Sequence, residues 1–149
     1  MFNIALYQPD IPQNTAAIIR LCSCFDATLE IIEPCGFHIN DKRLKKVAMD
    51  YLDKSQIIIY KSYEHFLKSK KKSRIILMTT KSKKNYYKFK FKKKDTLLFG
   101  RENSGVPANV HADSHQSLKI PINKNTRSLN ISISVAITLA EAIRQNVKI

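Results

Sequence analysis

The sequence predicts one α/β domain over residues 1–149, with a mostly parallel sheet of about six strands and helices on both faces. Three observations support this fold class. The length is that of one compact domain, and no linker or internal repeat divides it. Hydrophobic residues make up 44% of the chain and charged residues 26%, as in ordinary globular proteins. Short apolar runs alternate with segments of helical periodicity, the pattern of parallel strands joined by helices.

In the first half of the chain, three apolar runs of strand length are each followed by a segment with helical features. Pro12 begins the first of these segments, because proline is favoured in the first turn of a helix. Ile18, Ile19 and Leu21 then recur at helical spacing. The predicted strands of this half are Phe2–Tyr7, Leu29–Ile32 and Gln56–Tyr60. The helical segments that follow them, in the same order, are residues from 12 onward, Asp41–Ala48 and Tyr63–Ser69.

The second half continues the alternation. A polar turn precedes Pro107, which predicts another helix start, and Ser128–Gln145 is predicted to be the closing helix. We expect Lys81–Asp95 to be the least regular segment, because it is polar and basic. The predicted strands of this half are Arg74–Thr79, Thr96–Phe99 and Leu118–Ile120.

Positive charge is concentrated in one part of the chain. The net charge is +14, and residues 61–94 hold 13 lysines and Arg74 against the single acid Glu64. Such a field attracts polyanions, so it indicates nucleic acid as a partner. Surface lysines also often do no more than solvate a protein, and 20 lysines against 6 arginines suggest compositional bias. Four aromatic residues among the lysines would either stack on bases or pin the segment to the core: Tyr86, Tyr87, Phe89 and Phe91.

The cysteines and the apolar runs indicate a cytoplasmic protein. Cys22, Cys24 and Cys35 are odd in number and lack C-x-x-C spacing, so we expect three buried thiols and no disulfide framework. No apolar run approaches the roughly 18 residues of a membrane span, and we expect no membrane partner. The first residues lack the pattern of a secretory signal.

The glycines exclude two common cofactor sites. With only Gly36, Gly100 and Gly105, the G-x-G-x-x-G turn of dinucleotide-binding folds cannot occur. Gly100 and Gly105 have the spacing of a phosphate-binding loop, but Val106 and Pro107 stand where its lysine and its serine or threonine are needed.

Unusual polar residues follow three of the predicted strands, where ligands bind in open α/β sheets. The three segments are residues 9–20, 97–107 and 120–132. Taken singly, each has an ordinary explanation, such as turn glycines or a serine or asparagine that caps a helix. Together and in this order, they resemble the three motifs of the SPOUT-class RNA ribose methyltransferases. Within that class, I-A-L-Y-Q-P-D-I-P-Q-N-T and I-I-E-P-C-G-F resemble the small enzymes that methylate the wobble position of tRNA.

The resemblance covers essentially the whole chain except residues 81–95. It implies a C-terminal deep trefoil knot, a homodimer, tRNA as substrate and S-adenosylmethionine as cofactor. The reaction would be methyl transfer to the ribose 2′-OH of a wobble-position pyrimidine, either cytidine or modified uridine. The implied cofactor contacts are Met78, Thr79, Gly100, Ile120, Ser128 and Leu129.

The resemblance also implies a catalytic group. Arg20 matches the arginine that the family is thought to use as a base, although a guanidinium with a pKa above about 12 is a poor proton acceptor. Arg20 would alternatively orient a phosphate or stabilise the developing alkoxide. Asn14, Glu102 and Asn130 match the polar partners expected to hold Arg20 and the nucleotide. Lys81 and Arg127 are candidates for contacts with RNA phosphates.

Some residues depart from the family pattern. Ala16 and Ala17 replace a glycine-containing pair, Ile133 stands where many relatives have asparagine, and Ala140 where some have tyrosine. These departures bear on substrate detail.

A histidine pair gives no convincing metal site. His111 and His115 lie one helical turn apart, but no acidic residue or cysteine nearby completes a motif, and exposed helix residues are the better interpretation. We therefore expect no metal.

Two other functions remain open. One is a non-catalytic, basic RNA-binding or ribosome-assembly protein that uses residues 61–94. The other is a 2′-O-methyltransferase of ribosomal RNA. Small residues along the last helix suit either a dimer interface or packing within one chain: Ser132, Ser134, Ala136, Ala140 and Ala142.

Overall fold

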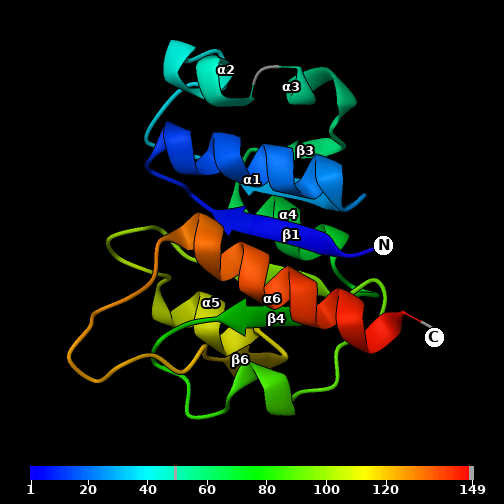
Figure 1. Cartoon of the computed structure of the whole chain (residues 1–149), viewed down its shortest axis with the longest axis vertical. Helices are drawn as coiled ribbons and strands as arrows, with labels where there is room; N and C mark the ends of the chain where they lie inside the picture. Colours follow the sequence, from blue (N-terminus) through cyan, green and yellow to red (C-terminus); the bar gives the residue numbers. More distant parts are fainter. Residues whose placement is uncertain (49, 148–149) are drawn as a thin grey trace.

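In a computed structural model that describes residues 1–48 and 50–147, six strands form one parallel sheet (Figure 1). The strand order is β3-β2-β1-β5-β4-β6, and every neighbouring pair is parallel. The predicted fold class is therefore confirmed. The strands are β1 (Asn3–Tyr7), β2 (Thr28–Ile32), β3 (Ile57–Tyr60), β4 (Ile75–Met78), β5 (Thr96–Phe99) and β6 (Gln116–Leu118).

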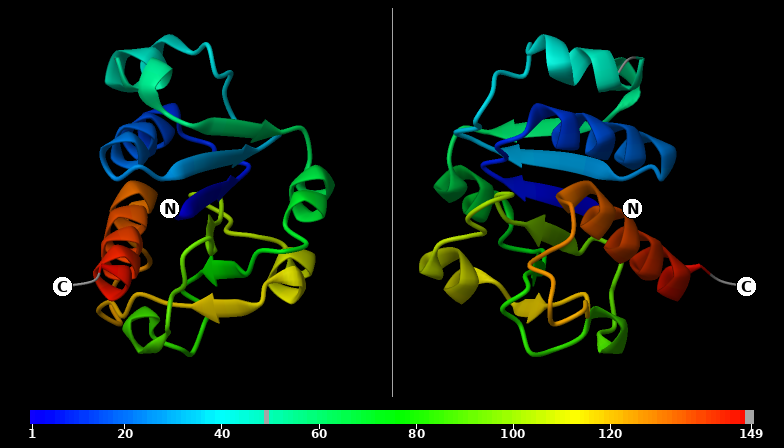
Figure 2. Two further views of the ribbon diagram at one scale, coloured as in Figure 1. Left: turned by 90° about the vertical axis from the view of Figure 1, so that its right-hand side faces the viewer. Right: turned by 60° about the vertical axis from the view of Figure 1, so that its left-hand side comes forward.

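Helices cover both faces of the sheet (Figure 2). One face carries α1 (Pro12–Cys24), α2 (Lys42–Ala48), α3 (Tyr51–Lys54) and α6 (Ile131–Asn146). The other face carries α4 (Tyr63–Ser69) and α5 (Ala108–Asp113). None of the helices among the described residues has the length and apolar character needed to cross a membrane.

Alternating side chains of the strands build a core on each face. In β1, Ile4 and Leu6 pack with α1, α2 and α6, while Ala5 and Tyr7 pack with α4 and α5. Glu30 of β2 is an exception, because it is a buried acid. Its carboxylate pairs with the ammonium of Lys70, which directly follows α4.

The structure shifts two predicted boundaries near the C-terminal end. β6 spans Gln116–Leu118, two residues before the predicted strand, because Gln116 and Ser117 pair with β4 although they are polar. α6 begins at Ile131 rather than Ser128 because Asn130 is the N-cap, accepting a hydrogen bond from the main-chain N–H of Ser132. Two short helical turns were not predicted, α3 and the 3₁₀ helix η1 (Tyr86–Lys88).

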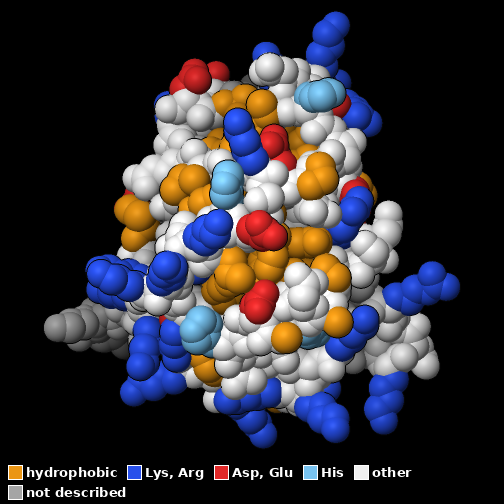
Figure 3. All heavy atoms as spheres, turned by 180° about the vertical axis from the view of Figure 1, so that it is seen from behind, with side chains coloured by type: hydrophobic (Ala, Val, Ile, Leu, Met, Phe, Trp, Pro, Cys, Tyr) orange, Lys and Arg blue, Asp and Glu red, His pale blue; other side chains and the backbone are white. Residues whose placement is uncertain are grey.

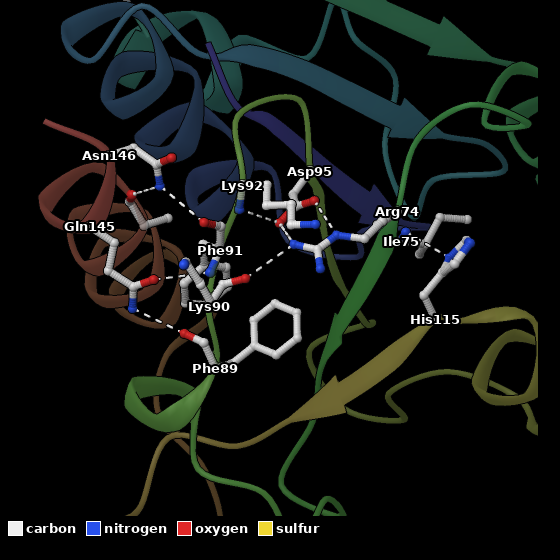
Figure 4. Close-up of polar contacts among 11 residues, drawn as sticks. Arg74, Ile75, Phe89, Lys90, Phe91, Lys92, Asp95, His115, Gln145 and Asn146 are labelled. Carbon is white, nitrogen blue, oxygen red and sulfur yellow. Dashed lines mark hydrogen bonds and ion pairs between the residues drawn. The ribbon is translucent and has the colours of Figure 1, made fainter.

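The lysine-rich connection between β4 and β5 is held at two points (Figure 4). The side-chain amide of Gln145 accepts from the N–H of Phe91 at 2.9 Å and donates to the carbonyl of Phe89 at 3.1 Å. Asp95 is 3% exposed, and its carboxylate accepts two hydrogen bonds from Arg74, at 2.6 and 2.8 Å. Lys81–Asp95 has little regular secondary structure, as expected, since η1 is the helical turn within it, but these side-chain contacts hold the segment in place. Because Phe91 is buried, this aromatic side chain pins the segment to the core.

The cysteines differ in burial. Cys22 is buried, Cys35 is half-buried, and Cys24 is exposed at the end of α1, so the expectation of three buried thiols is wrong for Cys24. All three are free thiols. Burial raises the pKa of Cys22 to about 12, and burial together with nearby acids raises that of Cys35 to about 11. These two thiols are therefore poor nucleophiles at neutral pH.

Candidate active site

A cavity of about 690 Å³ lies at the carboxyl ends of β4 and β5. Its walls come from four parts of the chain: the start of α1, the residues after β4, the turn after β5, and the loop that leads from β6 into α6. This is the position where ligands bind in open parallel sheets. All of the predicted site residues except Arg20 line it: Asn14, Met78, Thr79, Lys81, Gly100, Glu102, Ile120, Arg127, Ser128, Leu129 and Asn130.

Arg20 lies outside this cavity. It is exposed near the end of α1, six residues and therefore about 9 Å of helix beyond Asn14. Its guanidinium carbon lies 5.2 Å from the centre of the Tyr51 ring, a cation–π contact. Within one chain, Arg20 is therefore separated from Asn14, Glu102 and Asn130, and the expectation that they hold it stays a prediction for a site shared by two chains.

Glu102 joins the turn after β5 to the start of α1. Its carboxylate oxygens accept hydrogen bonds from the main-chain N–H groups of Asp10 at 2.8 Å and Ile11 at 3.1 Å. Ile11, the N-cap of α1, has no side-chain oxygen to serve the unpaired N–H groups there. The negative charge of Glu102 also suits the positive end of the α1 dipole. Its contacts therefore make Glu102 a positioning residue for the start of α1, where Asn14 lies.

Asn14 and Asn130 form an ordered amide pair. The amide nitrogen of Asn130 donates to the side-chain oxygen of Asn14 at 3.0 Å. The side-chain oxygen of Asn130 is in turn fixed by the main-chain N–H of Ser132 at 2.9 Å and by its hydroxyl at 2.6 Å. Among the described residues, the amide nitrogen of Asn14 makes no hydrogen bond, so it can donate one to a ligand in the cavity.

The sequence reasoning missed Arg101, which also lines the cavity. Its guanidinium contacts both carboxylate oxygens of Asp10 and reaches the side-chain oxygen of Gln8 at 3.4 Å. The hydrogen bond to Asp10 raises the pKa of Arg101, which is therefore charged at any ordinary pH. Arg101 and Glu102 thus tie the same turn to the loop after β1. The sequence signal that could have identified Arg101 is its charge opposite to that of Asp10, which lies in another of the three motifs.

The glycines after β5 serve a tight turn. Arg101 and Gly105 exchange two main-chain hydrogen bonds, each of 3.0 Å, which close the turn. A Cβ atom on Gly100 would lie 2.7 Å from the carbonyl carbon of Gly105, whereas one on Gly105 would meet open space. Gly105 has a φ of +64°, in the left-handed region that favours glycine.

We predict that Gly100→Ala lowers the free energy of unfolding by about 1–3 kcal/mol, because main chain must move to accommodate the methyl group. Gly105→Ala, the matched control, should cost about 1–2 kcal/mol from strain alone and leave the cavity wall in place. Urea unfolding measures both values. Cofactor binding should weaken more in Gly100→Ala than in Gly105→Ala. Equal weakening would contradict the predicted collision of the added methyl group with the main chain of Gly105.

The two histidines differ in their surroundings. His111 is half-buried in α5 and lines the cavity. His115 follows the end of α5, so its assignment to a helix is wrong. The Nδ1 atom of its ring accepts from the main-chain N–H of Ile75 at 3.0 Å (Figure 4). The main-chain N–H of His115 donates to the carbonyl of Ile75 at 2.9 Å. His115 therefore anchors the start of β4.

The residues that depart from the family pattern do not line the cavity. Ala16 is buried in the core, and Ala17 is half-buried on α1. Ile133 and Ala140 are exposed on α6. Any effect of the last two on substrate detail would therefore act through the outer surface of α6.

Comparisons with known proteins found similar sequences along nearly the whole chain. A family model described as the SpoU rRNA Methylase family matches residues 1–140. The chain is 41% identical over 144 residues to a protein from Beijerinckia indica named tRNA (cytidine(34)-2′-O)-methyltransferase, covering 95% of this chain and 90% of that one. A protein of the same name from Escherichia coli is 37% identical and covers 97% of this chain and 94% of its own length.

Solved structures give the same picture. One described as "Structural insights into the 2-OH methylation of C/U34 on tRNA" has a TM-score of 0.94 and 33% identity, covering 97% of this chain and 95% of that chain. An AdoMet-bound rRNA methyltransferase from Sinorhizobium meliloti is 21% identical with a TM-score of 0.90, covering 99% of this chain and 57% of that one. At that identity, the likeness extends to the fold alone.

Proposed function

Because this chain belongs to the SpoU rRNA methylase family, we propose that it is a tRNA 2′-O-methyltransferase that uses S-adenosylmethionine. Its acceptor would be the ribose 2′-OH of the wobble-position pyrimidine, cytidine or modified uridine, in the anticodon loop. One observation carries the proposal: the cavity at the carboxyl ends of β4 and β5 gathers the motif residues in a chain whose near full-length relatives bear that name. The deep trefoil knot stays a prediction from the family, and the cytoplasm stays the predicted location.

The cavity fits the proposed cofactor. Its volume lies within the range of about 300–1,000 Å³ that is typical of small-molecule sites. Met78 and Leu129 give it apolar walls, and Thr79, Gly100, Ile120 and Ser128 complete the predicted contacts. When bound, S-adenosylmethionine supplies a methyl group on a positively charged sulfonium. Because that charge disappears during transfer, a weakly hydrated, partly apolar cavity favours the reaction.

The remaining residues would hold the acceptor nucleotide. The acceptor 2′-oxygen would take the methyl group from the cofactor, and its hydroxyl proton would pass to a neighbouring water molecule or base. The free amide nitrogen of Asn14, fixed by Asn130, is placed to donate a hydrogen bond to the ribose. Lys81 and Arg127 at the cavity wall would bind the neighbouring phosphates. None of these roles requires a metal ion.

Arg20 can take part in the proposed reaction only if a second copy of the chain brings it to the cavity. Exposed apolar side chains support such a homodimer: Ile11 is 37% exposed, Leu129 is 37% exposed, and Ile133 at the start of α6 is 51% exposed. α1 and α6 lie in the same layer, so a copy docked on that layer would also meet Arg20 (Figure 2). Ala140 on α6 is small and exposed, which permits close approach, whereas Ala142 packs in the core of its own chain.

The test is transfer of labelled methyl from S-adenosylmethionine to tRNA that lacks the modification, followed by nucleoside analysis. We expect a 2′-O-methylated pyrimidine at the wobble position. Asn14→Ala should lower the rate about 10²-fold, as expected for loss of one preorganised hydrogen-bond donor, without unfolding the chain. Label in ribosomal RNA instead of tRNA would support the ribosomal alternative. Cofactor affinity that is undetectable would favour a non-catalytic RNA-binding protein.

A further inference from the structure

Two segments beside the cavity contain no acidic residue. Residues 65–94 and 114–140 hold no aspartate or glutamate, although they contain many lysines. Figure 3 shows the result on the rear face, where Lys and Arg project along the lower edge and no Asp or Glu is visible there. Lysines without nearby acids keep their full attraction for phosphate groups.

Main-chain pairing brings these two segments together next to the cavity. The N–H of Lys119 donates to the carbonyl of Lys84 at 2.8 Å, and the N–H of Tyr86 donates to the carbonyl of Lys119 at 2.9 Å. Lys81 lines the cavity two residues before Lys83, and Ile122 lines it two residues before Lys124. A lysine strip therefore continues from the cavity rim, formed by Lys83, Lys84, Lys119 and Lys124.

The lysine strip differs from other cations of the basic region in having no acidic partner. Lys70 pairs with buried Glu30, and Arg74 pairs with buried Asp95, so these two cations serve the fold. The five side-chain ion pairs found among the described residues include no residue of the strip. Lys83, Lys84 and Lys124 are also exposed, and Lys119 is half-buried. The ammonium of Lys84 lies 5.3 Å from the centre of the Phe89 ring, a cation–π contact that leaves its charge without an acidic partner. The charges of the strip are therefore available to a ligand.

We propose that the lysine strip binds the sugar-phosphate backbone of the RNA. The bound part of the backbone would run from the acceptor nucleotide in the cavity past β6. This rests on the proposed function, because it presumes that an RNA nucleotide enters the cavity. RNA fits the strip by charge, since its phosphates form a row of anions and its binding releases condensed counterions. Backbone contacts of this kind position a nucleic acid without reading its sequence.

The same connection contains a matched control at the opposite edge of the sheet. Next to Lys92 and Lys93, the N–H of Lys94 donates to the carbonyl of Met1 at 3.1 Å. This end therefore lies at the amino ends of β1 and β5, and the four residues of β5, about 13 Å, separate it from the cavity edge. Lys92 and Lys93 are exposed, like Lys83 and Lys84, and the two pairs carry the same charge.

The experiment compares K83Q/K84Q with K92Q/K93Q. Binding of tRNA, followed by fluorescence anisotropy over a range of salt concentrations, gives the slope of log K against log salt concentration. We expect K83Q/K84Q to reduce that slope by about 1.5 and to raise the KM for tRNA about tenfold, with kcat and cofactor affinity unchanged. K92Q/K93Q should resemble the unmodified protein. Thermal unfolding checks that both doublets fold.

Two results would overturn the lysine strip while the protein still methylates tRNA. Equal effects of the two doublets would indicate a diffuse positive field, and no effect of K83Q/K84Q would place the RNA elsewhere. Failure of the proposed function is a different observation, namely that the unmodified protein transfers no methyl to tRNA.

Discussion

Arg20→Ala is expected to lower kcat for methyl transfer by about 10²–10³-fold, the loss that follows removal of one group that stabilises developing charge. The fold should be unaffected, because the side chain is exposed and its described contact is the stacking on Tyr51. Cofactor affinity should also be unchanged, since Arg20 does not line the cavity of its own chain. Single-turnover kinetics and calorimetric titration with S-adenosylmethionine measure these quantities.

The same variant tests whether Arg20 acts on a second copy of the chain. Ser128→Arg should block the cavity with a bulky cation and leave α1 intact, because Ser128 is exposed and lines that cavity. Each variant alone should be inactive. Co-expressed chains should regain about a quarter of normal activity, because random pairing makes half of the dimers mixed and each mixed dimer has one complete site. Continued inactivity of the mixture would contradict a shared site.

Lys70→Met should strongly destabilise the fold. It removes the partner of Glu30, which is 2% exposed, and leaves an uncompensated carboxylate between β2 and α4. Breaking a buried pair in this way costs about 3–5 kcal/mol of unfolding free energy. Glu30→Leu combined with Lys70→Met should recover most of the loss, because two apolar side chains need no partner. Urea unfolding of the two variants gives the comparison.

The loss in Lys70→Met should depend on pH. Burial raises the pKa of Glu30 above its ordinary value of 4.5, and Lys70 opposes this rise. Without Lys70 the pKa rises further, so the folded variant keeps a proton that the unfolded chain releases above pH 4.5. The unfolding free energy of the variant should therefore fall as pH rises from 4.5 to the new pKa, and then level off. A pH-independent loss would show that Glu30 stays ionised.

The sequence predicted the elements whose patterns are local. Apolar runs located the strands of the central sheet, and the helix from Pro107 and the segment Tyr63–Ser69 appear where they were expected. β6 was misplaced because only Leu118 of its residues is buried, and pairing with β4 rather than apolar character defines the strand. The order in Lys81–Asp95 comes from Gln145 and Arg74, which are distant in sequence, so no local pattern could predict it.

The sequence predicted which residues line the candidate site better than it predicted what each of them does. Motif positions identified the lining residues, because the carboxyl ends of parallel strands meet at one edge. The resemblance grouped Glu102 with Arg20, whereas Glu102 holds the main chain of Asp10 and Ile11. The resemblance also grouped Asn14 with Arg20, and only the path of α1 reveals that the Arg20 side chain lies outside the cavity of its own chain. The roles depend on contacts between segments that are distant in sequence, which spacing does not encode.

The position of α6 determines when during synthesis the protein can begin to work. Its first residues close the cavity through Asn130, Ile131 and Ser134, and its last residues fasten the lysine-rich connection through Gln145. Chains are made from the N-terminus and fold as they emerge. A growing chain can therefore pair its six strands while the ligand site is still open on one side. Only a chain whose residues up to 146 have emerged can both close the cavity and fasten the lysine-rich connection.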